Sequence, residues 1–292
     1  MLEKLKYPIS TGCFTEKPFR SFYYIIRVIL SDFFKLKINY KAEINKSKFF
    51  YNYKPYSKNG LGGRGQYVLR EYYDKFFFIG QKILPKKFNF VDIGCSRGFF
   101  SLYLLGLQNF KGSGLCIDPL SKALQDFKEI LKLNKKSKIK FVNGIISNKK
   151  KIKTFIYKVS KQGYYSIIKN ISFADKFPSG KNPESFLTKS YKLDHLVITK
   201  KLITDIKFIK IDAEGAEYEI LLSSKKTIKK FKPTFYCEVT RKKKEIYNLF
   251  KKENYILFYF NKKKLTKLKI NTFRGGELLA IHKKNSYFSK IQ

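Results

Sequence analysis

The chain has 292 residues, 43% of them hydrophobic, and carries a formal net charge of +40 at pH 7. This length suits one large α/β domain with an extension, and the apolar content is ample for a buried core. Lysine supplies 55 of the 62 basic residues. Such charge attracts polyanions, but the lysine runs fall in expected turns and on exposed helix faces. They favour a solvated coat over a nucleic-acid groove, so nucleic acid is not the expected partner.

The four cysteines lie far apart in the sequence, at positions 13, 95, 116 and 237. This spacing excludes a disulfide framework and a zinc site, and it indicates a reducing, cytoplasmic compartment. No stretch reaches the roughly 20 uninterrupted apolar residues that a membrane-spanning helix needs. The most apolar segment, 19–34, is interrupted by Arg27 and Asp32 and lacks the small-residue cleavage site of a signal peptide.

Residues 1–64 form a basic, aromatic extension. Within 19–36, apolar residues recur at three- and four-residue steps, which predicts an amphipathic helix. Two fates are open for its apolar face, namely packing on the rest of the chain or peripheral contact with an anionic membrane. The glycine-rich stretch 60–65 lacks the Lys-Ser/Thr of a phosphate loop and is interpreted as a hinge or lid.

A strand, a turn and a helix follow between residues 88 and 107. The apolar strand ends near Asp92, and the helix is amphipathic. The turn between them contains Gly94, Cys95, Ser96 and Gly98. Turns of this kind bring backbone N–H groups close to a nucleotide-type ligand, and Asp92 supplies a carboxylate facing the same crevice.

A second short strand ends at Asp118, 24 residues after Gly94. An acid at about this offset reaches the ribose of a bound nucleotide, so we expect Asp118 to bind ribose hydroxyls. The third strand, 139–142, ends at Asn143, which we place on the cofactor side. Two further strands are expected at 153–157 and 164–168. The irregular segment 174–191 is predicted to shape an acceptor pocket.

The second motif-rich stretch is a strand over 206–211 that runs into Asp212 and Glu214. A fifth strand, 234–239, carries Glu238 at its end. Acids at the carboxyl ends of parallel strands face the crevice where such sheets bind ligands. The last two strands, 255–260 and 278–282, are joined by a medium loop that suits an antiparallel pair.

These elements predict a doubly wound, mostly parallel, seven-stranded sheet with an antiparallel terminal strand pair. This arrangement is the class I methyltransferase (Rossmann-like) type, here with an N-terminal helical extension. The expected division is 1–64 for the extension and 65–292 for the methyltransferase domain.

The chain resembles the FkbM-type methyltransferases from about residue 65 to 285. Four stretches carry the resemblance in the right order: 91–100, with Cys95-Ser96 where the family usually has Ala-Asn; 193–196, with His195 where a second acid is common; 210–218, which matches nearly throughout; and Lys232-Pro233 followed by Glu238-Val239. The resemblance implies methyl transfer from S-adenosylmethionine, usually to a hydroxyl of a sugar, a surface-glycan precursor or another small polar metabolite, and a link to polysaccharide biosynthesis.

Under this hypothesis the cofactor-binding residues are Asp92, Gly94, Cys95, Ser96, Gly98, Asp118 and Asn143. Asp92 accepts from the ammonium group of the cofactor, and Asp118 takes its ribose. Asp212 and Glu214 are the first candidates for acceptor binding or general base, with His195 and Glu238 behind them.

Several points stay open from the sequence. No spacing of the acids requires a divalent cation, so no metal is assigned. One alternative function is an RNA ribose methyltransferase, which the charge favours, and another is a non-catalytic scaffold that keeps the fold. The oligomeric state is unknown.

Overall fold

The computed structural model describes most of the domain and part of the extension. The described ranges are 38–44, 47–53, 75–135, 138–149, 151–159, 162–166, 184–261 and 264–285, with seven helical positions between 19 and 34. The glycine-rich stretch 60–65 and the boundary at 64/65 lie outside these residues. So does 167–183, which holds much of the predicted acceptor loop. Within the described residues, no helix is long and apolar enough to cross a membrane.

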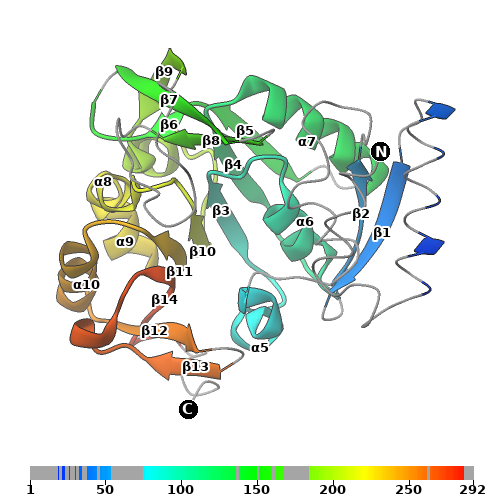
Figure 1. The fold of residues 1–292 in the computed structure, drawn as a ribbon. Coiled ribbons are helices and arrows are strands. Elements are labelled where there is room, and N and C mark those ends of the chain that lie inside the picture. The colour runs from blue at the N-terminus through cyan, green and yellow to red at the C-terminus, as the bar shows by residue number, and fades with distance from the viewer. Residues whose placement is uncertain are drawn as a thin grey trace.

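An eight-stranded sheet organises the domain, in the order β13-β12-β14-β11-β10-β3-β4-β5 (Figure 1). Its strands are β3 (Asn89–Ile93), β4 (Gly114–Asp118), β5 (Ile139–Asn143), β10 (Ile206–Ile211), β11 (Thr234–Val239), β12 (Tyr255–Asn261), β13 (Lys264–Lys267) and β14 (Gly276–His282). Neighbours from β5 to β11 are parallel, and β14 runs antiparallel to both β11 and β12. The predicted class and the antiparallel terminal pair are confirmed, and β13 adds an eighth strand to the predicted seven.

Helices cover both faces of this sheet (Figure 1). They are α5 (Gly80–Ile83), α6 (Phe99–Gly106), α7 (Ser121–Leu133), α8 (Glu217–Leu222), α9 (Lys225–Phe231) and α10 (Lys243–Lys252). Successive strand residues pack in opposite cores, as Phe90 and Val91 do. The first core is aromatic and lies under α6 and α7, and the second is mostly aliphatic and lies under α8 and α10. Because these strands are buried on both faces, they read as apolar runs in the sequence.

A second, four-stranded sheet is inserted between β5 and β10. It consists of β6 (Ile145–Ile146), β7 (Lys151–Val159), β8 (Gln162–Ser166) and β9 (Glu184–Tyr191), in the order β6-β9-β7-β8. β6 follows directly after β5 and touches β4, so the insertion lies beside the carboxyl edge of the main sheet. The prediction of irregular structure over 174–191 is wrong for 184–191. Those residues form β9, because they pair with β6 on one side and β7 on the other.

The extension contains a β-hairpin as well as a helical part. β1 (Ile38–Ile44) and β2 (Ser47–Tyr53) pair antiparallel, and β2 packs on α6 and α7. Phe49 and Tyr51 are buried against the ring of Phe99, with centroids 5.3 and 5.4 Å away. Ser47 donates a 2.6 Å hydrogen bond to the carbonyl of Tyr103. The hairpin therefore belongs to the aromatic core of the domain.

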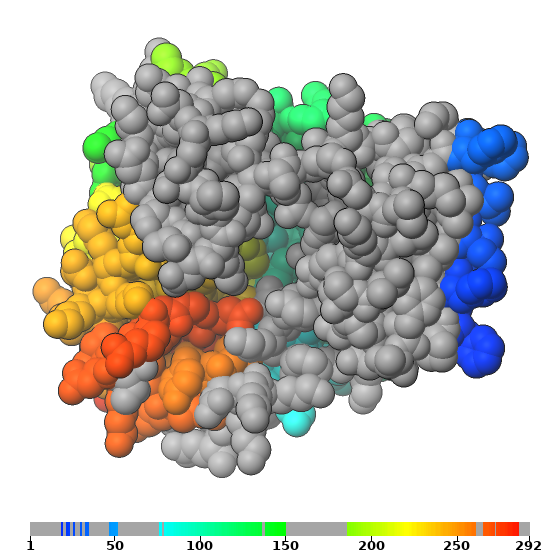
Figure 2. All heavy atoms as spheres, in the orientation of Figure 1, coloured from blue at the N-terminus to red at the C-terminus, as the bar shows by residue number. Residues whose placement is uncertain are grey.

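The described helical positions of the extension behave differently. They are Phe19, Phe22, Tyr23, Ile26, Leu30, Phe33 and Phe34, and all seven side chains are exposed. Figure 2 shows their atoms in blue along the right-hand edge of the molecule. Packing on the domain, one of the two fates open for this apolar face, is therefore not observed for these side chains.

Candidate active site

The predicted site residues gather where the winding of the sheet reverses. β3 lies between β4 and β10, with α6 following β3 on one face and α8 following β10 on the other. In open α/β sheets, ligands bind in the crevice at the carboxyl ends of the strands beside such a switch point. Asp92, Asp118, Asp212 and Glu238 all lie at the carboxyl ends of strands in this central part of the sheet.

The turn after β3 is shaped by backbone contacts. Gly94 has a φ of 77°, and a Cβ there would lie 1.8 Å from the carbonyl oxygen of Asp212. Gly98 has a φ of 75°, and its Cβ would lie 2.1 Å from the ring of Phe127. Glycine is thus required at both positions, by conformation and by space. The turn after β3 and the turn after β10 consequently touch through their backbones.

Hydrogen bonds inside the protein hold the same turn. The N–H groups of Gly94 and Cys95 donate to Ile117, and that of Gly98 donates to Cys95. Ser96, with a φ of 48°, donates its N–H to Oδ2 of Asp118 at 2.8 Å. These four N–H groups are engaged within the chain, so the turn presents a fixed backbone surface to a ligand. The Cys95 side chain is buried, which explains why a small residue stands there.

Asp118 is a buried acid at the end of β4. Its Oδ1 accepts the N–H of Leu120 at 2.9 Å, and Oδ2 accepts that of Ser96. Burial raises the pKa of Asp118 to about 6 in spite of these hydrogen bonds. Each carboxylate oxygen has a second lone pair, which leaves acceptor capacity for ribose hydroxyls. Asn143 supports the same loop by donating its side-chain amide to the carbonyls of Asp118 and Pro119.

Asp92 is fully buried on β3. Ser101 on α6 donates a 2.6 Å hydrogen bond to its Oδ2, whereas Oδ1 has no hydrogen-bond donor among the described residues. Burial is the main cause that raises the pKa of Asp92, and the nearby charge of Lys210 lowers it. Oδ1 faces the ammonium of Lys210 at 3.7 Å, and this ion pair offsets part of the cost of burying the carboxylate.

Lys210 connects the two halves of the site, and the sequence analysis assigned it no role. Its side chain is 8% exposed, and Nζ lies 3.0 Å from Oδ2 of Asp212 and 3.7 Å from Oδ1 of Asp92. It also lies 5.4 Å from the centroid of the Phe100 ring. The signal in the sequence is a lysine inside a strand that is buried on both faces, where a charge needs a partner.

Three glutamates surround Asp212. Burial, followed by repulsion from Asp212 and Glu217, raises the pKa of Glu214 to about 8. Repulsion from Asp212 is the main cause that raises the pKa of Glu238 to about 8, and repulsion from Glu214 and a hydrogen bond with Asp212 add to the shift, although Glu238 is exposed at the end of β11. Burial raises the pKa of Glu217 to about 7, although its Oε1 accepts the N–H of Gly215 at 2.8 Å.

The structure therefore brings Asp212, Glu214 and Glu238 together as predicted, and it places them beside Asp92. Glu214 has a φ of 49°, a conformation that non-glycine residues rarely adopt and that is often found at functional sites. No group of three or more His, Cys, Asp or Glu side chains among the described residues is arranged to hold a metal ion.

His195 and Asp194 lie apart from this cluster. His195 is exposed and begins a π-helical turn, His195–Thr199. Within the described part of the chain, no hydrogen bond or ion pair joins its side chain to the acids. Asp194 accepts hydrogen bonds of 2.7 to 2.9 Å from Lys226 and Thr227, at the start of α9. The Leu-Asp motif thus contributes a helix cap.

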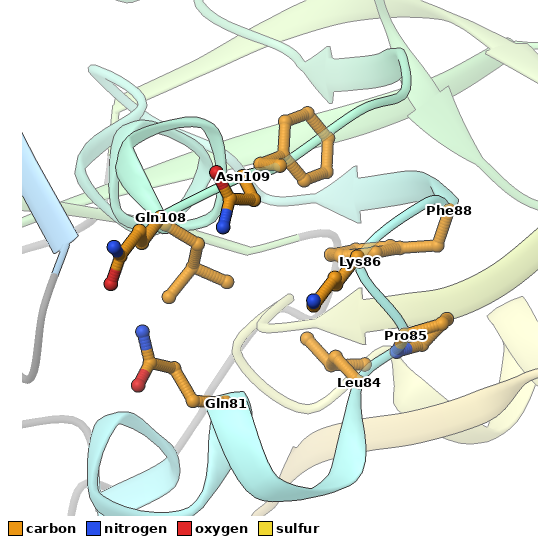
Figure 3. A pocket seen from close by; sticks show the side chains of 9 residues that line it. Gln81, Leu84, Pro85, Lys86, Phe88, Gln108 and Asn109 are labelled. Carbon is orange, nitrogen blue, oxygen red and sulfur yellow. The ribbon is translucent and has the colours of Figure 1, made fainter.

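A pocket of about 200 Å³ opens elsewhere, at the amino ends of β3 and β4 (Figure 3). It is lined by Gln81, Leu84, Pro85, Lys86, Phe88, Leu107, Gln108, Asn109 and Phe110. Ligand sites usually have roughly 300–1,000 Å³, so this pocket is small. Because it lies at the opposite edge of the sheet from the acids, we do not connect it with the chemistry of the site.

Comparison with known proteins agrees with this geometry. The profile described as Methyltransferase FkbM domain matches residues 92–263. The chain belongs to the FkbM methyltransferase family. The resemblance seen in the four motifs is confirmed. A comparison with curated protein sequences gave no match.

Several solved structures are similar to the chain. The FkbM methyltransferase of Methylobacillus flagellatus KT is 15% identical, with a TM-score of 0.45, and the match covers 75% of this chain and 52% of that protein. The chain thus spans about half the length of that relative. M. capricolum TrmK, in complex with S-adenosyl-homocysteine, is 14% identical with a TM-score of 0.38, covering 71% and 68% of the two chains. A fibrillarin/Nop5p complex is 11% identical with a TM-score of 0.39, and the match covers 72% of this chain and 80% of that one.

The raised pKa of Glu214 predicts a change in stability with pH. Between about pH 4.5 and 8, the folded protein holds a proton that the unfolded chain has released, so this group makes folding less favourable as pH rises through that window. The Glu214→Gln variant removes the group. We expect its Tm to equal that of the wild type near pH 4 and to exceed it by about 2–4 °C at pH 9, equivalent to about 1 kcal/mol.

Differential scanning fluorimetry across this pH range makes the measurement. The control is Glu219→Gln on α8, where the carboxylate is 42% exposed and 3.8 Å from the ammonium of Lys242. Such an exposed pair contributes little, so this control should not gain stability at pH 9. Equal Tm values for Glu214→Gln and the wild type at pH 9 would contradict the assignment.

Proposed function

We propose that the chain is an S-adenosylmethionine-dependent O-methyltransferase. Its acceptor is a hydroxyl of a sugar, a surface-glycan precursor or another small polar metabolite. The observation that carries this proposal is the cluster of Asp212, Glu214 and Glu238 at the switch point, directly beside Asp92. Membership of the FkbM family supports methyl transfer as the reaction.

The residues on β3 and β4 fit the cofactor. Oδ1 of Asp92 accepts no hydrogen bond among the described residues and lies 3.7 Å from Lys210, and in this proposal the carboxylate accepts from the ammonium group of S-adenosylmethionine, directly or through water. Asp118 retains acceptor capacity for the two ribose hydroxyls at the end of the next strand. When bound, S-adenosylmethionine supplies an electrophilic methyl group on a sulfonium centre.

The acids beyond β10 and β11 fit a general base. A hydroxyl is a weak nucleophile, and removal of its proton by a positioned base typically contributes about 10²–10⁴-fold. Glu214 and Glu238, with pKa values near 8, take up a proton more readily than ordinary carboxylates do. In this proposal the ionised form of one of them receives the proton of the acceptor hydroxyl. Asp212, held by Lys210, orients the acceptor.

The RNA alternative rests on the net charge alone. Glu214 and Glu238 add negative charge at the carboxyl edge of the sheet as they ionise with rising pH, which disfavours the phosphates of an RNA strand there and favours a neutral polar acceptor. Incubation with methyl-labelled S-adenosylmethionine should place the label in sugar or glycan-precursor fractions and leave total RNA unlabelled. Label that enters RNA, and no longer does so at high salt, would instead favour the RNA ribose methyltransferase.

The cytoplasmic assignment also remains a proposal. It is supported by Cys95, Cys116 and Cys237, which are buried free thiols in the described part of the chain.

The Asp118→Asn variant tests the cofactor site. It keeps the size of the side chain and removes the charge that strengthens hydrogen bonds from ribose hydroxyls, so we expect the Kd for S-adenosylmethionine to rise about tenfold or more. Isothermal titration calorimetry measures the Kd, and a thermal melt establishes that the variant is folded. Asp205→Asn, at the other end of β10 beside Lys207, is the matched control and should bind like the wild type. Unchanged affinity in folded Asp118→Asn would reject the ribose assignment.

The Lys210→Met variant tests the electrostatics of the base. Lys210 lowers the pKa values of Glu214 and Glu238, so its loss should raise them further. We expect the rising limb of the pH–rate profile to move toward alkaline pH by about one unit, with turnover at pH 7.5 reduced about tenfold. The acids titrate as a group, so the profile reports the cluster.

Lys210→Arg is the matched variant, because it keeps the charge and should keep the position of the profile. The loss in Lys210→Met should shrink as the pH is raised to 9. A loss that stays the same at every pH would assign Lys210 a purely structural role.

A further inference from the structure

The exposed part of the extension forms an apolar surface unlike the rest of the molecule. Ten large hydrophobic side chains are exposed among the described residues, and seven of them lie between positions 19 and 34. Phe19 is 90% exposed and Phe33 is 78% exposed. We call the seven residues Phe19, Phe22, Tyr23, Ile26, Leu30, Phe33 and Phe34 the exposed stripe. Clusters of this kind usually mark a binding surface.

The spacing of the stripe places it on one side of a helix. Its members are separated by steps of three, one, three, four, three and one residues. At about 100° per residue, all seven fall within an arc of about 120°. Over fifteen residue steps the stripe extends for about 22 Å, at 1.5 Å per residue. It is therefore a continuous ridge, which suits a flat or shallow partner.

Composition and charge favour an anionic lipid surface over a second copy of the chain as the partner of the stripe. Five of the seven residues are aromatic, and aromatic residues prefer the boundary between lipid headgroups and acyl chains. Residues 1–37 contain seven Lys and Arg and only three Asp and Glu, and the whole chain carries +40. Two copies with this charge repel each other, whereas an anionic lipid surface attracts the chain.

We propose that the exposed stripe docks the protein on an anionic membrane surface, lying in the headgroup layer with its apolar side chains directed inward. In this arrangement the basic residues of the extension contact anionic headgroups. The docking is peripheral. It goes beyond the methyl-transfer proposal and stands or falls independently of it.

Sedimentation with sucrose-loaded vesicles tests the proposal with the full chain. Vesicles of phosphatidylcholine with about 30% phosphatidylserine should bind the protein, and vesicles of phosphatidylcholine alone should bind it much more weakly. Binding should fall when the salt is raised from 0.1 M to 0.5 M. Absence of binding to the anionic vesicles would overturn the proposal.

Two variants separate the stripe from the general charge. The double variant Phe19→Ser/Phe33→Ser changes the two most exposed members, which have little to lose in packing, and should bind the anionic vesicles about tenfold more weakly. Leu187→Ser, at an apolar side chain on β9 that is 75% exposed, is the matched control and should bind like the wild type. Equal binding by the double variant would mean that lysine charge alone holds the protein on the vesicles, and it would reject the proposed docking.

Light scattering of the protein without vesicles tests the alternative that a second copy of the chain binds the stripe. A concentration-dependent dimer that disappears in the double variant would assign the stripe to self-association and overturn the membrane proposal. A thermal melt of each variant provides a check on folding that does not involve the stripe.

Discussion

The arrangement of acids at the carboxyl ends of the central strands depends on a buried ammonium group, that of Lys210. Lys210 stands between Asp92, on the cofactor side, and Asp212, on the side of the base. Carboxylates gathered in a weakly polar setting repel one another, and one cation offsets only part of that repulsion. Burial and then this remaining repulsion raise the pKa of Glu214, and repulsion from Asp212 is the main cause that raises the pKa of Glu238. The same cation therefore stabilises the two halves of the site and sets how basic its glutamates are.

Backbone geometry adds a second link between these halves. The Cα of Gly94 lies against the carbonyl of Asp212, with no room for a side chain between them. Beyond this contact, Ser96 and Glu214 both adopt left-handed backbone conformations. Strain of this kind persists only where the surrounding structure fixes it. Since the backbone shapes the turn, the departure from the family at Cys95-Ser96 leaves its form intact.

Local patterns predicted most of the main sheet. Apolar runs that end in small residues or acids gave β3, β4 and β10, and the loop of medium length between the last long strands indicated an antiparallel pair. The acids of the site were found because they stand at strand ends. The pairing of Lys210 with Asp92 could not be found in this way, since it depends on the parallel register that sets β10 beside β3.

Long-range contacts account for the other differences. β9 is rich in polar residues, and its strand form depends on partners 28 to 45 residues earlier in the chain. Asp194, in the Leu-Asp pair of the family resemblance, caps a helix that begins more than 30 residues later. The hairpin β1–β2 shows alternation in its own sequence, yet its burial depends on rings that α6 supplies.

That hairpin also changes what counts as the folding unit. The region that the family shares begins at residue 92, whereas Phe49, Tyr51, Phe76 and Phe77 are buried in the same core as α6. A fragment trimmed to the shared region would leave the aromatic side of α6 open to water and prone to aggregation. The aromatic core of this chain thus extends well before the matched range 92–263, because it includes residues of the hairpin and of the segment before β3.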